Sequence, residues 1–99
     1  MTPFEELLQK ERIPTISGIL SMLCNQKTAE DIQKCVTEYE NWFVVNVIDE
    51  SVPRGQELAV ARQNIGYIIG YVEPKEERDR LYQALNVSHP IFGTAFGRI

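Results

Sequence analysis

The stretch Q-E-L-A-V-A-R-Q-N-I-G-Y-I-I-G-Y-V, residues 56 to 72, decides the fold that the sequence predicts. Placed on a helix at about 100° per residue, its side chains fall into separate lines. The aliphatic line contains Leu58, Ala61, Ile65, Ile68, Ile69 and Val72, the small-residue line contains Ala59, Gly66 and Gly70, and a third contains Val60, Tyr67 and Tyr71. Such a helix has to be covered over most of its circumference, so we expect it at the centre of a helical bundle.

A Gly-Tyr pair repeats after four residues within this stretch, as N-I-G-Y-I-I-G-Y at 64 to 71. An interior glycine destabilises a helix by about 0.8–1 kcal/mol relative to alanine, so a compensating contact is expected. Close approach of another backbone is the simplest compensation. We therefore predict that Gly66 and Gly70 face a neighbouring backbone, most simply one from the same domain.

Capping residues and apolar spacing predict the remaining helices. Thr2, Pro3 and Glu5 follow the order of an N-cap, a first helical residue and a capping-box acid, and so predict a helix that ends near Arg12. Further helices are predicted at about 15–24, from Thr28 to about Asn41, and from Pro74 to about Asn86.

The segment F-V-V-N-V-I, residues 43 to 48, is rich in β-branched residues and is followed by polar and turn-forming residues. This composition predicts a strand. A lone strand needs a partner for its backbone groups. The tail T-A-F-G-R-I, residues 94 to 99, is one candidate partner, and the same strand of a second subunit is the other, which would make the protein a homodimer.

These elements together predict a mainly α protein, a single domain over residues 1–99. It should be a small bundle of four to five short helices with one short strand or extended segment near 43–48. A chain of 99 residues buries roughly 60–65 per cent of its unfolded surface, which supports one modest core.

The charge balance bears on the class of partner. A net charge of -4 and a pI near 4.9 disfavour nucleic-acid binding, which depends on clustered Lys and Arg. The acidic excess promotes solubility and could steer the protein towards a basic partner surface. No apolar run approaches the roughly 18 residues of a membrane span, and the N-terminus has no apolar core of a signal peptide. The sequence therefore predicts a cytoplasmic protein that does not enter a membrane.

Ten residues separate Cys24 from Cys35, and the chain has one histidine, which gives too few ligands for a structural zinc site. Each cysteine lies on an apolar helical stripe and is predicted to be a buried free thiol, typical of a reducing cytosol.

Candidate chemistry centres on His89, the only side chain whose ordinary pKa lies near neutrality. No nucleophile motif or orienting group is recognisable near it, so packing or capping of a helix end is the favoured interpretation. Gly66 and Gly70 fit neither the dinucleotide nor the phosphate-loop pattern. The sequence thus predicts no catalytic residue, no metal and no cofactor, and a protein that is not an enzyme.

Candidate binding residues are taken from the polar and aromatic side chains near the Gly-Tyr repeat and the H-P-I-F-G segment at 89 to 93. Tyrosines supply rigid contact area with a polar tip, although closure over the domain's own core is the favoured role for this pair. An arginine on this helix, if buried, needs a carboxylate, and an anion ligand is the alternative. The candidates are Arg62, Asn64, Tyr67, Tyr71, His89 and Phe92.

Residues 56 to 93 resemble a type of small uncharacterised protein encoded by tailed bacteriophages and prophages. The resemblance rests on N-I-G-Y-I-I-G-Y at 64 to 71, Arg78 or Arg80 in the next helix, and H-P-I-F-G at 89 to 93. It implies a phage or prophage origin and action in the host cytoplasm, and implies no activity.

The sequence leads to three functional hypotheses. The first is a non-enzymatic accessory protein that binds an unknown host or phage protein, or itself as a homodimer. The second is a small-ligand protein that binds or sequesters a nucleotide or metabolite. The third is a minor structural component of the virion.

Overall fold

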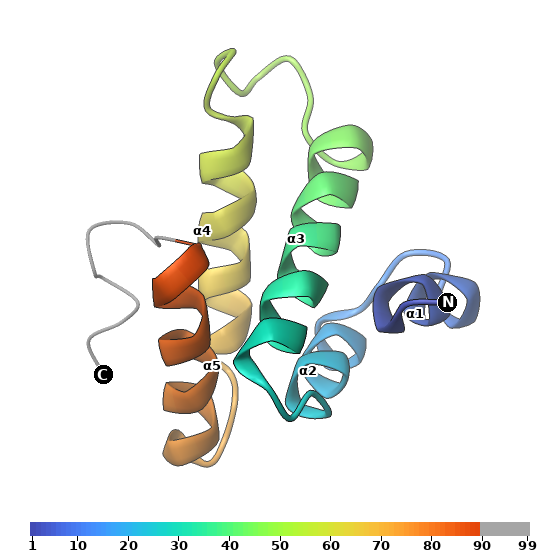
Figure 1. Cartoon of the computed structure of the whole chain (residues 1–99). Helices are drawn as coiled ribbons and strands as arrows, with labels where there is room; N and C mark the ends of the chain where they lie inside the picture. Colours follow the sequence, from blue (N-terminus) through green and yellow to red (C-terminus); the bar gives the residue numbers. More distant parts are fainter. Residues whose placement is uncertain (90–99) are drawn as a thin grey trace.

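The computed structural model describes residues 1–89, and within them the chain forms five helices in succession (Figure 1). They are α1 (Pro3–Lys10), α2 (Ile16–Cys24), α3 (Ala29–Asn46), α4 (Glu57–Ile69) and α5 (Lys75–Ser88). The prediction of a mainly α bundle is confirmed. Among the described helices, none is both long enough and apolar enough to cross a membrane.

The centre of the bundle is α3, which packs against each of the other four helices. Figure 1 shows α1 and α2 on one side of α3, and α4 and α5 on the other. The prediction that residues 56–72 form the central helix is therefore wrong. At 18 residues α3 is the longest helix described, and its length gives every other helix a surface to pack on.

Thr2 and Thr28 cap the first and third helices as predicted, and Thr15 caps the second. Thr2 forms a complete capping box with Glu5, because its hydroxyl accepts from the Glu5 amide and the Glu5 carboxylate accepts from the Thr2 amide. Thr15 and Thr28 accept from the amides of Gly18 and Asp31 in the same way.

The predicted strand at 43–48 is not formed. Residues 43 to 46 continue α3, and the Val47 amide donates to the Phe43 carbonyl over 2.9 Å. Phe43 follows Tyr39 by one helical turn and is buried with it, so helical packing prevails over the strand propensity of the valines. Without this strand, neither of the two predicted pairings can form. Residues 94–99 lie outside the described part of the chain.

Most of the aliphatic line of α4 is buried in the core, whereas Leu58 at its start is exposed. Gly66 is also buried, and its carbonyl accepts a hydrogen bond of 2.9 Å from the Tyr82 hydroxyl of α5. Gly70 is exposed and caps the helix with right-handed dihedrals, so its predicted contact with a backbone is wrong. Among the described residues of other helices, the side chain next to both glycines is that of Tyr82.

Candidate binding surfaces

A carboxylate lies inside the core at Glu40 of α3, where only 2% of the residue is exposed. Its Oε2 accepts from Arg62 Nε of α4 over 3.1 Å. Burial raises the pKa of Glu40 because it penalises the charged form, and the adjacent guanidinium opposes that rise. Arg62 therefore provides the internal partner that a carboxylate buried in the core requires.

His89 caps α5 from the other side of the same carboxylate. Its Nε2 lies 2.8 Å from Thr37 Oγ1 and 3.4 Å from Glu40 Oε1, and its Nδ1 lies 2.6 Å from Ser88 Oγ. Burial lowers the pKa of His89, and the positive charge of Arg62 lowers it further, so the ring is neutral near pH 7. We assign the tautomer with hydrogen on Nε2, because that hydrogen points at Thr37 and Glu40 while Nδ1 accepts from Ser88.

A second internal bond joins Tyr39 to Asn64, whose Oδ1 accepts from the Tyr39 hydroxyl over 2.5 Å. Burial raises the pKa of Tyr39 to about 12, so the hydroxyl keeps its proton and acts as the donor. Three of the predicted binding residues, Arg62, Asn64 and His89, thus reach α3 and are engaged inside the fold. We call Thr37, Glu40, Arg62 and His89 the polar cluster.

Neither cysteine forms a reactive pair with the imidazole. Both thiols are free, and burial raises the pKa of Cys35 to about 11 and also raises the pKa of Cys24. A protonated thiol is a poor nucleophile. Within residues 1–89 there is also no cluster of His, Cys, Asp and Glu suited to hold a metal ion.

The two tyrosines of the Gly-Tyr repeat are on the surface. Tyr67 is 58% and Tyr71 is 71% exposed, so the prediction that they close over the core is wrong. Tyr67 still accepts a hydrogen bond of 3.3 Å from Gln63. Phe92, the last candidate, lies outside the described residues.

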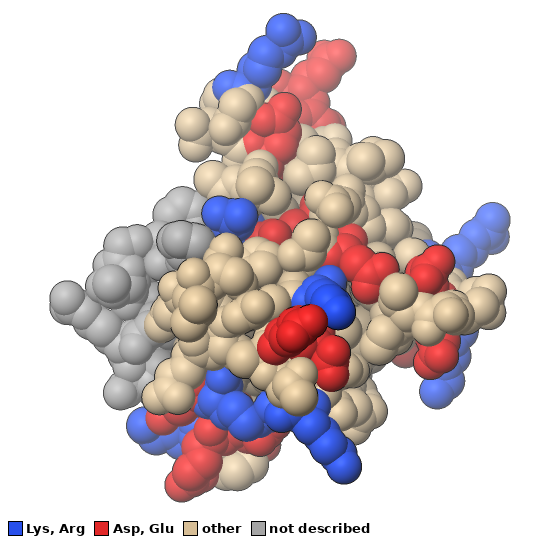
Figure 2. Space-filling view, in the orientation of Figure 1, with Lys and Arg blue, Asp and Glu red and all other residues tan. Residues whose placement is uncertain are grey.

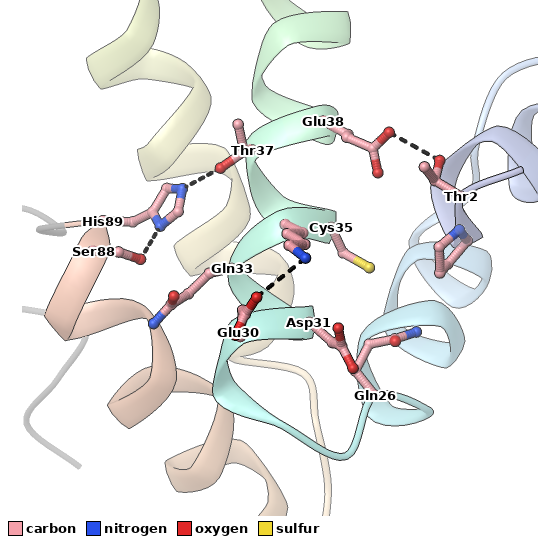
Figure 3. A pocket seen from close by; sticks show the side chains of 12 residues that line it. Thr2, Gln26, Glu30, Asp31, Gln33, Cys35, Thr37, Glu38, Ser88 and His89 are labelled. Atoms are coloured by element: carbon pink, nitrogen blue, oxygen red, sulfur yellow. Dashed lines mark hydrogen bonds and ion pairs between the residues drawn. The ribbon is translucent and has the colours of Figure 1, made fainter.

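One hollow of about 530 Å³ lies over α3 between the start of α1 and the end of α5 (Figure 3). We call it the trough. Its polar groups are largely bonded to one another: Thr2 donates to Glu38 over 2.9 Å, and Lys34 lies 3.2 Å from Glu30. The polar lining of the trough comprises Thr2, Gln26, Glu30, Asp31, Gln33, Lys34, Thr37, Glu38, Ser88 and His89.

A second surface lies where α3 ends and α4 begins. Figure 1 shows that, of the described elements, only these two helices and their connection reach the upper end of the molecule. Val45 there is 79% exposed, and Val47 and Leu58 are exposed as well. A hollow of about 540 Å³ at the same end is lined by other apolar residues, Val44, Ile48, Val52 and Pro53. We call the apolar residues at this end the tip: Val44, Val45, Val47, Ile48, Val52, Pro53 and Leu58.

Sequence reasoning missed both Glu40 and the tip. Glu40 interrupts an otherwise apolar stripe one turn after Val36, which was a usable signal for a buried ion pair. The valines of the tip were assigned to a strand instead of an exposed helix end. Comparison of the chain with protein-family models, curated proteins and solved structures finds no match.

Proposed function

We propose that the protein is a small, non-enzymatic accessory protein that acts by binding another protein. The exposed apolar side chains of the tip carry this proposal. Contiguous exposed apolar side chains, rimmed by polar residues, are typical of contact sites for other macromolecules. The phage or prophage origin and the action in a host cytoplasm are part of the proposal, and rest on the sequence resemblance of residues 56–93.

The remaining chemistry of the chain supports binding over catalysis. The His89 ring is neutral and its nitrogens face Thr37, Glu40 and Ser88. A general base needs its lone pair directed at a substrate proton, and that lone pair already accepts from Ser88 in our assignment. The polar cluster is therefore better suited to hold α3, α4 and α5 together than to perform a reaction.

The test is capture of partner proteins from cells that encode the protein, with a tagged chain and quantitative mass spectrometry. Replacement of Val45 and Leu58 by Asp should abolish capture of a specific partner, because charges in the apolar centre of an interface have to be desolvated. Val87→Asp is the matched control, since Val87 is 82% exposed but lies on α5. Equal capture by both variants would exclude the tip as the binding surface.

Small-ligand binding in the trough is the second candidate. Its volume of about 530 Å³ lies within the range of ligand pockets, and Gln33 and His89 supply polar groups at its edge. A thermal-shift screen with nucleotides and metabolites tests it, because a bound ligand raises the melting temperature. A flat response across the panel would exclude ligands of those classes.

A further inference from the structure

Charged residues surround the tip unequally. Asp49, Glu50 and Glu57 contribute three negative charges and Arg54 one positive charge, which leaves a net charge of -2 around the hollow. Arg54 forms no ion pair with any residue that the structure describes. Figure 2 shows both signs of charge at the upper end of the molecule, with uncharged side chains between and below them.

Two of these carboxylates are held in place by hydrogen bonds. The Ser51 amide and hydroxyl both donate to Asp49 Oδ1, over 2.9 and 2.5 Å, and lower the pKa of Asp49. Glu57 Oε1 accepts from the Gly55 amide over 2.7 Å. Fixed charges lose little freedom when a partner binds, so they favour binding of an opposite charge.

We infer that the tip binds a segment of the partner that carries apolar side chains flanked by Lys or Arg. This inference rests on the proposed function and specifies the partner's chemistry. The apolar side chains would enter the hollow beside Val44, Ile48 and Val52, and the basic groups would meet the carboxylates at its rim. Four apolar and four charged residues line the hollow together, and specific protein interfaces combine apolar contacts with complementary charges.

The same charges disfavour other occupants. Two copies of the chain joined through their tips would bring two surfaces of net charge -2 together, and the whole chains, at -4 each, also repel. Nucleic acid and anionic membrane surfaces are repelled for the same reason. A basic segment is the occupant for which both the apolar and the charged parts of the tip are favourable.

The test uses a fluorescent helical peptide of Leu and Lys, about 18 residues long, and the full-length protein. Fluorescence anisotropy should show binding that weakens about tenfold between low and high salt, because exposed charges are screened. Glu50→Lys should weaken binding about tenfold through local repulsion. The matched control Glu76→Lys makes the same change in net charge on α5, at the end of the molecule away from the tip, and should weaken binding much less.

Five outcomes would overturn the inference. Equal weakening by Glu50→Lys and Glu76→Lys would mean general attraction to an acidic protein, and equal binding of a Leu and Glu peptide would exclude charge recognition. A doubled mass in sedimentation that Val45→Asp abolishes would identify a second copy as the occupant. If partner capture depends on Val45 and Leu58 but the peptide does not bind, the inference is overturned and the proposed function stands. Capture independent of both residues would exclude the tip as the binding surface, and with it the inference.

Discussion

Val36 and Val45 belong to the same helix and differ completely in environment. Val36 is 0% exposed, whereas Val45 is 79% exposed. The first part of α3 has other helices on both sides, but near its C-terminal end only α4 continues beside it (Figure 1). The identity of the side chain does not account for the difference, which arises from how far the neighbouring helices extend. An apolar residue that no helix of its own chain covers is therefore available to a partner.

The inner part of α3 also differs from the tip in its polar groups, because it contains the polar cluster. Glu40 lies on α3, Arg62 on α4 and His89 directly after α5, and they are bonded to one another or to Thr37. Their polar groups are engaged within the protein, while the apolar groups of the tip are exposed. Mutations should therefore affect stability at the inner part and partner binding at the tip.

The largest expected effect is that of Glu40→Ala. It leaves Arg62 and His89 without their buried partner and should lower the free energy of unfolding by about 3 kcal/mol. This value is at the lower end of the range for breaking a buried ion pair, because the Arg62 side chain is partly exposed to solvent. Urea denaturation measures it. Glu30→Ala is the control on the same helix, where an exposed pair with Lys34 contributes under about 1 kcal/mol. Similar losses for both variants would show that Glu40 makes no special contribution.

A pH dependence of intermediate size should come from His89. Its pKa lies below the ordinary 6.5 in the folded protein, so the unfolded chain takes up the proton first as pH falls below about 6.5. Its contribution to stability is thus lost with falling pH, by at most about 1.4 kcal/mol per pH unit. Glu40, with a raised pKa, binds its proton first in the folded state and opposes this loss at lower pH, towards its ordinary 4.5.

The measurement is the free energy of unfolding at several pH values between about 7 and 5.5, for the native protein and His89→Gln. The native protein should lose stability towards pH 5.5, and His89→Gln should show a flatter profile. The glutamine retains polar groups for Thr37 and Ser88 but does not titrate. An unchanged slope in the variant would assign the pH dependence to other groups.

The sequence predicted those parts of the fold that depend on local interactions. Thr2, Thr15 and Thr28 cap their helices with residues three positions away, so a single sequence contains the whole interaction. The end of α3 was missed because valines favour a strand only weakly, and the burial of Phe43 depends on distant helices. Arg62 and His89 were predicted as candidates, but their meeting at Glu40 joins positions that only the tertiary fold brings together.

The smallest expected change in stability is that of Val45→Ala. Because Val45 is almost fully exposed, its removal leaves no cavity, and alanine has the higher helix propensity. The free energy of unfolding should therefore stay within about 0.5 kcal/mol of the native value. Val36→Ala is the matched substitution in the core and should lower it by about 2 kcal/mol, through lost burial and the cavity left behind. A comparable loss at Val45 would mean that the tip is packed within the isolated protein, and would remove the physical basis for a partner there.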